Sequence, residues 1–229
     1  MRNTVPNIIE EHLPPYDYIV LTTKNIPDIS PTVVDLVAPA LSLDNKHTVL
    51  VLIQNGLHIH KPFAISYPST IVLSGISMIG SEEVSLGCIE QGDHDRLIIG
   101  QFLCTSSSLN ESAEAAAREF VRMYASGGKT NCSYGPSVLH DRWRKLVYNA
   151  CLNPICAITG LDTGRIRLAG GGATVEMLVR PAMQEIVKAA KTCDNVDLGE
   201  SIVQQMIDVD PLDAYLSPSM LADVRKVRL

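Results

Sequence analysis

Two apolar runs separated by one helical stretch constrain the fold of this chain most strongly. The runs occupy residues 18–22 and 48–53, and neither alternates between apolar and polar side chains. A strand that is apolar in both directions belongs inside a sheet whose two faces are covered, as in parallel sheets. We expect a helix over residues 30–42, between the two runs. This strand–helix–strand order is the repeating unit of a doubly wound α/β sheet.

The two parts of the chain differ in their predicted structure. Residues 70–74, 87–90 and 96–99 are short apolar segments between glycine-rich or polar turns, and we expect them to form a meander that closes the sheet. Only helices are expected after residue 108, so the domain boundary is predicted near residues 110–129. The expected helices span 113–124, capped by Asn110 or Ser112, 137–159 with a kink at Pro154, 174–193, 202–207 and 220–227.

Composition excludes several functional classes. The net charge of −6 argues against a nucleic-acid partner that is bound by neutralising phosphates. The longest uncharged run, 62–81, is interrupted by prolines and serines, and the first residues lack the apolar centre of a signal peptide, so we expect no membrane partner. Six cysteines without a C-x-x-C pair are typical of free thiols in a reducing cytoplasm. His58 and His60 have no evident third ligand nearby, and we expect no metal site.

The most informative chemistry lies in the sequence DRWRKLVYNACLNP at residues 141–154. On a helix, Lys145, Asn149 and Asn153 follow each other at intervals of four residues and therefore share one stripe. A lysine beside two carboxamides suits a proton donor flanked by groups that orient a substrate. Partial burial would lower the pKa of such a lysine towards the working pH. The spacing alone favours a solvent-exposed lysine with two surface asparagines, because both residue types are common on helix surfaces.

Four segments in order resemble one enzyme family. KLVYNACLNP at 145–154 resembles the catalytic helix of the ketopantoate reductases (2-dehydropantoate 2-reductases), and DYIVLTTK at 17–24 is similar to a strand-and-lysine segment of their nucleotide domain. IQNG at 53–56 resembles their asparagine–glycine turn at the cofactor, and PSMLADVR at 218–225 resembles their serine-containing substrate helix. The resemblance extends over nearly the whole chain.

The resemblance implies an NADPH-dependent reduction of 2-dehydropantoate to pantoate, with NADP(H) as the cofactor. It implies that Lys145 is the general acid and that Ser219 holds the substrate carboxylate. By the same resemblance, Asn149 and Asn153 bind the hydroxyl and carbonyl groups of the substrate. Lys24 and Asn55 would lie beside the cofactor, where doubly wound sheets bind ligands. Without the resemblance, Lys24 fits a solvated loop residue and Asn55 a turn-forming residue before glycine.

The same resemblance sets the expected domains. Residues 1–110 should form a partial NADP-binding Rossmann domain without the family's first strands and glycine fingerprint, and 111–229 an α-helical substrate domain with a shortened end. The fold class is thus α/β followed by all-α. Two alternatives stay open: a related reductase of another branched 2-oxo acid, and a non-catalytic fragment or helical interaction protein. We expect a small-molecule 2-oxo acid partner, and keep a homodimer open as the assembly.

Overall fold

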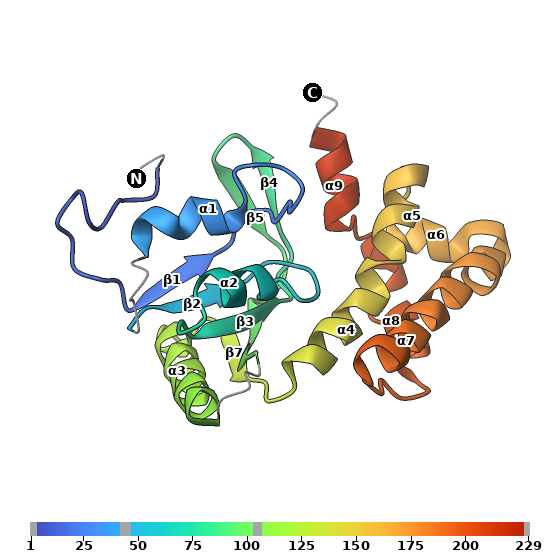
Figure 1. Cartoon of the computed structure of the whole chain (residues 1–229). Helices are drawn as coiled ribbons and strands as arrows, with labels where there is room; N and C mark the ends of the chain where they lie inside the picture. The colour runs from blue at the N-terminus through green and yellow to red at the C-terminus, as the bar shows by residue number, and fades with distance from the viewer. Residues whose placement is uncertain (1–3, 42–46, 103–106, 227–229) are drawn as a thin grey trace. The chain divides into compact units, whose positions relative to one another are not determined.

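The structure, a computed structural model, describes residues 4–41, 47–102 and 107–226. The chain divides into two compact units, Met1–Val138 and Leu139–Leu229. The first contains a mixed sheet with parallel strands and flanking helices, and the second is helical (Figure 1). The predicted fold class, a partial Rossmann-type sheet followed by an α-helical part, is confirmed.

Five strands form the main sheet of the first unit, in the order β1-β2-β3-β6-β7. The first three strands run parallel, β6 is antiparallel to β3, and β7 is parallel to β6. Because β1 and β2 are parallel and in register, their carboxyl ends lie side by side. The strands are β1 (Tyr18–Leu21), β2 (Val49–Leu52), β3 (Val72–Ser77), β6 (Arg96–Gln101) and β7 (Asn131–Tyr134).

Strand β2 separates two apolar cores, one on each face of the sheet. Leu50 and Leu52 pack with α1 (Val33–Val37) and α2 (Lys61–Ser66) on one face. Val49 and Val51 pack on the other face with α3 (Ser107–Ala125). The prediction that residues 48–53 are buried in both directions is therefore confirmed. The same prediction for residues 18–22 is wrong in part, because β1 is an edge of the described sheet and Val20 is 44% exposed.

Residues 87–90 do not join the main sheet, contrary to the predicted meander. They belong to a separate hairpin of β4 (Ser81–Ser85) and β5 (Cys88–Gln91), whose residues are all exposed. The physical reason is the charge of this segment, because Glu82, Glu83 and Glu90 cannot be buried between helices without cost. Strand β3 pairs directly with β6 instead.

Helix α3 and strand β7 belong to the first unit. Ala117 and Phe120 of α3 share a core with Leu97 and Ile99, and β7 pairs with β6. The two units therefore divide after Val138, beyond the predicted boundary region of residues 110–129. Helix α3 also begins at Ser107, before both of the predicted caps, Asn110 and Ser112.

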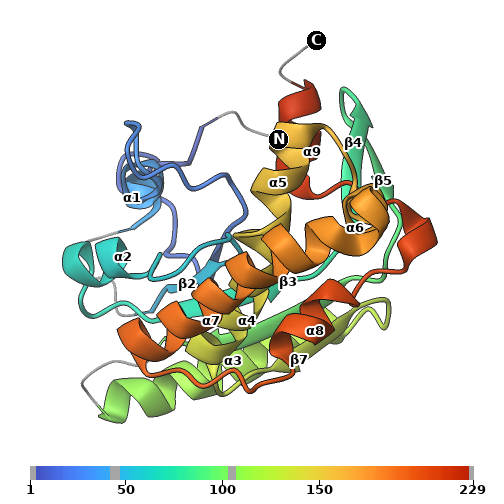
Figure 2. The same ribbon diagram turned by 90° about the vertical axis from the view of Figure 1, so that its right-hand side faces the viewer.

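The second unit contains six helices in its described part. Helices α5 and α9 pack against each other, as do α7 and α8, which Figure 2 shows side by side. A π-helical turn, Val175–Val179, precedes α7, so the predicted 174–193 helix is not uniform. The six are α4 (Val138–Asn149), α5 (Leu152–Thr159), α6 (Thr163–Leu168), α7 (Arg180–Asp194), α8 (Ile202–Ile207) and α9 (Ser219–Lys226).

The predicted long helix over 137–159 is two helices, because α4 ends at Asn149 and α5 begins at Leu152. Pro154 has no N–H to donate to the carbonyl of Ala150, and its ring would clash with that carbonyl in a continuous helix. At the break, Cys151 N donates to the carbonyl of Tyr148 at 3.2 Å instead of continuing the regular α-helical pattern. The proline therefore ends α4 about one turn before its own position in the chain.

None of the helices in the described ranges combines the length and apolar character needed to cross a membrane.

Gly100 in β6 should tolerate no side chain. A Cβ atom there would lie 2.1 Å from the carbonyl oxygen of Gly135 and 2.6 Å from Val138 Cγ2. We expect Gly100→Ala to lower the free energy of unfolding by about 1–3 kcal/mol, as overpacking does. Thermal denaturation measures this loss, and Gly127→Ala is the control because a Cβ at Gly127 meets nothing within 4 Å. Equal melting temperatures for the two variants would contradict the close approach.

Candidate active site

The loops that follow β1 and β2 are joined at the carboxyl end of the sheet. Ile53 N donates to the carbonyl of Leu21 at 2.9 Å, which continues the pairing of the strands beyond their ends. The buried side chain of Gln54 then donates through Nε2 to the Thr23 carbonyl at 2.8 Å and to Thr23 Oγ1 at 3.1 Å. Lys24 and Asn55 each come directly after one of these two joined residues.

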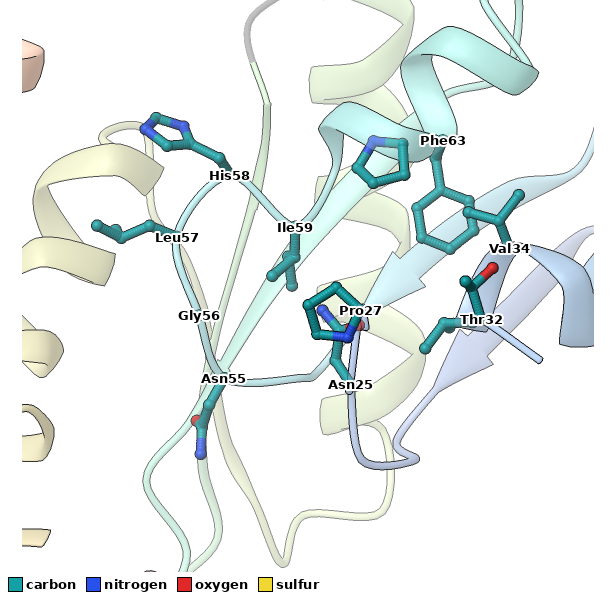
Figure 3. A pocket seen from close by; sticks show the side chains of 12 residues that line it. Asn25, Pro27, Thr32, Val34, Asn55, Gly56, Leu57, His58, Ile59 and Phe63 are labelled. Carbon is teal, nitrogen blue, oxygen red and sulfur yellow. The ribbon is translucent and has the colours of Figure 1, made fainter. Parts of the chain in front are cut away.

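A pocket of about 380 Å³ opens beside these loops (Figure 3). Asn55 contributes to its lining, whereas the exposed Lys24 does not, and the next residue, Asn25, takes that place. Gly56 has φ +120°, and a Cβ there would lie 2.9 Å from Ile59 Cγ2, so the turn at Asn55 requires glycine. Asn55 thus both precedes a tight turn and lines a pocket. The walls include the apolar Pro27, Val34, Ile59 and Phe63 and the polar Asn25 and Thr32.

Lys145 and Asn149 lie in the last two turns of α4, and Asn153 lies in the first turn of α5. Lys145 and Asn149 are half-buried, and Asn153 is 7% exposed. This burial argues against the alternative of a solvent-exposed lysine with two surface asparagines. The break after Asn149 means that Asn153 does not continue the stripe of a single straight helix.

The environment of Lys145 disfavours its positive charge. Burial is the main cause, and the neighbouring positive charge of Arg142 adds to it, so that the pKa of Lys145 falls from its ordinary value to about 8. Arg142 lies one turn earlier on α4 and is itself 5% exposed, and burial lowers its pKa to about 10. An ammonium group with a pKa near 8 is an effective proton donor at neutral pH.

Arg142 is the residue of this cluster that sequence analysis missed. It precedes Lys145 by three residues and thus lies on the same side of α4. That spacing is visible in the sequence. The burial of the guanidinium is not, since arginine is rarely buried and an arginine on a helix is ordinarily solvated.

Two hydrogen bonds fix α4 on either side of Lys145. Trp143 Nε1 donates to the carboxylate of Asp194 at 2.7 Å, at the end of α7. The Tyr148 hydroxyl donates to the carboxylate of Asp210, in the loop that follows α8. The lysine therefore lies on a helix whose rotation and translation are restricted.

Ser219 is the first residue of α9, and its side chain is exposed. Helix α9 packs along α5 (Figure 1), and Leu221 of α9 is 1% exposed. The second unit thus brings the helix of Ser219 against the helix of Asn153.

The remaining candidates are the histidine pair and the cysteines. The His60 ring stacks on Phe102 with 4.0 Å between centroids, and the described residues contain no group of three or more His, Cys, Asp or Glu side chains suited to a metal ion. Cys104 lies outside the described residues. The free thiols are those of Cys88, Cys132, Cys151, Cys156 and Cys193.

Comparison with known proteins identifies related sequences along most of the chain. Residues 2–103 match the family model "Ketopantoate reductase PanE/ApbA", and residues 137–229 match "Ketopantoate reductase PanE/ApbA C terminal". The uncharacterized protein YDL144C of Saccharomyces cerevisiae is 33% identical over 228 residues, which are 93% of this chain and 62% of that protein.

Solved structures give the same relationship. The 2-dehydropantoate 2-reductase of Methylococcus capsulatus is 29% identical, with a TM-score of 0.67 over 92% of this chain and 62% of its own. The enzyme of that name from Geobacter metallireducens is 21% identical, with a TM-score of 0.77 over 97% and 68%. A D-mandelate dehydrogenase in complex with NADH and anilino(oxo)acetate is 19% identical, with a TM-score of 0.75 over 92% and 64%. The similarity to these last two structures shows a shared fold and nothing further. The chain spans 62% of the length of the first two relatives named, from yeast and Methylococcus.

The low pKa of Lys145 can be measured directly. In the folded protein, the rate of acetylation at Lys145 should rise through a pH midpoint near 8, whereas in guanidinium the midpoint should return to about 10.4. Mass spectrometry of peptides follows the reaction. Arg142→Met should move the folded midpoint upwards, because it removes the neighbouring positive charge. A folded midpoint above 10 would contradict this description of the site.

Proposed function

Because this chain belongs to the ketopantoate reductase family, we propose that the protein reduces 2-dehydropantoate, or a closely related 2-oxo acid, to the 2-hydroxy acid. The observation that carries the proposal is Lys145, whose pKa of about 8 suits a proton donor at neutral pH. Its neighbours Asn149 and Asn153 supply amide groups that can donate to and accept from a polar substrate.

The first unit fits the nicotinamide end of a dinucleotide. Its pocket lies at the carboxyl ends of β1 and β2, the edge at which doubly wound sheets bind nucleotides. The apolar walls suit a flat ring, while the Asn55 amide can bond a ribose or carboxamide group. Lys24, exposed after β1, offers a positive charge to a phosphate. Bound there, NADPH would supply the hydride that the ketone carbon receives.

The proposed role of Lys145 is to complete the reduction. As the ketone carbon gains hydride, its oxygen gains negative charge, which the ammonium group stabilises. The Lys145 Nζ proton then passes to this oxygen, and the neutral amine regains a proton from solvent. Asn149 and Asn153 would hold the hydroxyl and carbonyl groups of the substrate in reach. Ser219 would hold the carboxylate, through its hydroxyl at the start of α9.

Assay of the purified full-length protein tests the proposal. Oxidation of NADPH should depend on 2-dehydropantoate, and a panel of branched 2-oxo acids identifies the preferred substrate. NADH is assayed in parallel, since the D-mandelate dehydrogenase named above was solved with NADH. Absence of turnover with every acid and both cofactors would favour the alternative, a non-catalytic helical interaction protein. The cytoplasmic location and a homodimeric assembly stay predictions of the same kind.

Replacement of Lys145 should abolish most of the turnover. We expect Lys145→Ala to lower kcat by about 10²–10⁴-fold, the usual contribution of a positioned general acid, while the melting temperature stays close to that of the parent. Lys191→Ala is the control, since Lys191 is an exposed lysine on α7. A kcat within a few-fold of the parent would remove Lys145 from the mechanism.

Replacement of Ser219 should weaken the binding of the 2-oxo acid. Since a carboxylate anchor contacts the substrate equally in the ground and transition states, Ser219→Ala should raise KM for the 2-oxo acid more than it lowers kcat. Steady-state kinetics with saturating cofactor measures both constants. An unchanged KM together with a collapsed kcat would assign Ser219 a different role.

A further inference from the structure

The loop of residues 208–218 leads from α8 directly to Ser219. Most of its side chains are exposed, and an exposed loop of this length is ordinarily mobile. Here several contacts fix it, and they come from α6, α4 and α9. We call this segment the 208–218 loop.

Helix α6 supports the loop along its length. Arg167 Nη1 donates to the carbonyl of Asp210 at 2.6 Å, and Thr163 N donates to the carbonyl of Leu216 at 3.0 Å. Between these two points the loop approaches the α6 backbone closely, since a Cβ at Gly164 would lie 2.5 Å from the carbonyl oxygen of Leu212. The loop is thereby held against α6.

The contact that ties the loop to α4 is made by Tyr148. Its hydroxyl donates to the carboxylate of Asp210, 62 residues further along the chain. Burial is the first cause that raises the pKa of Tyr148, and the carboxylate of Asp210 raises it further, so the phenol keeps its proton and remains a donor. Tyr148 holds the side chain of Asp210, and Arg167 holds its backbone.

We propose that the hydrogen bond from Tyr148 to Asp210 is a positioning contact that sets the place of Ser219 relative to Lys145 and Asn149. Tyr148 lies between these two residues on α4, and Asp210 lies on the segment that delivers Ser219. The proposal rests on the proposed function, in which Ser219 holds the substrate carboxylate. It adds a residue pair that acts through Ser219 without contacting the substrate.

The geometry favours a role in binding over a role in proton transfer. The Tyr148 hydroxyl is already committed as a donor to a carboxylate, an interaction that is stronger than one between neutral groups. At the far end of the loop, Arg225 donates to Ser217 Oγ at 3.0 Å and to the carbonyl of Gly160 at 3.1 Å. Those contacts join the loop end to α9 and to the end of α5, whereas the hydrogen bond from Tyr148 joins the loop directly to α4.

Kinetics of Tyr148→Phe in the full-length protein test the proposal. KM for the 2-oxo acid should rise by about tenfold, the loss expected for a hydrogen bond to a charged group, with kcat and the cofactor KM within about twofold. Tyr124→Phe is the matched control, because Tyr124 donates to the carboxylate of Asp95 at 2.7 Å in the first unit. The control should leave every constant unchanged. A fall in kcat with constant KM would overturn the proposal.

A double-mutant cycle shows whether the effect passes through Ser219. In a Ser219→Ala background, Tyr148→Phe should change KM by less than about twofold, because the two changes then remove the same interaction. A full tenfold effect in that background would also overturn the proposal.

Hydrogen exchange separates this proposal from the proposed function, since it needs no turnover. Peptides covering residues 208–218 should exchange several-fold faster in Tyr148→Phe than in the parent or in Tyr124→Phe. Accelerated exchange in a protein that reduces no 2-oxo acid would retain the contact and reject the function. Unchanged exchange in an active enzyme would reject the contact and retain the function.

Discussion

The proposed chemistry of the second unit depends on the burial of the positive charge of Lys145. Taking an ammonium group out of water costs free energy, and the cost rises when a second buried cation lies one turn away, as Arg142 does beside Lys145. Burial is useful only if the group cannot swing out into solvent. The contacts of α4 with Asp194 and Asp210 restrict movement of the backbone that carries the lysine, because they hold the helix on both sides of it.

The break after Asn149 separates α4, which carries Lys145, from α5, which carries Asn153. Pro154 prevents a continuous helix, so α5 takes its own direction and packs along α9. Asn153, buried near the start of α5, and Ser219, exposed at the start of α9, therefore come from helices in mutual contact. In the first unit, β2 positions Asn55. This strand is buried on both faces of the sheet, and its burial fixes the carboxyl end that Asn55 follows.

Local pattern in the sequence predicts the features that depend on neighbouring residues. The continuous apolar run at 48–53 predicts β2, and the spacing of Lys145 and Asn149 predicts a shared helix face. Features that depend on distant residues could not be predicted. The exposed hairpin replaces a sheet strand because β3 pairs with β6 instead, and α3 joins the first unit because Phe120 fits a core built by strands before it. The contact of Tyr148 with Asp210 joins residues 62 apart and leaves no local signal.

The pH dependence of kcat/KM for the 2-oxo acid tests the central claim most directly, because it reports the protonation of Lys145 in the enzyme before the 2-oxo acid binds. We expect kcat/KM to be constant at low pH and to fall about tenfold per pH unit above the pKa of Lys145, near 8. The fall should begin at higher pH in Arg142→Met. A kcat/KM that stays constant from pH 6 to pH 10 would contradict a general-acid role for this lysine.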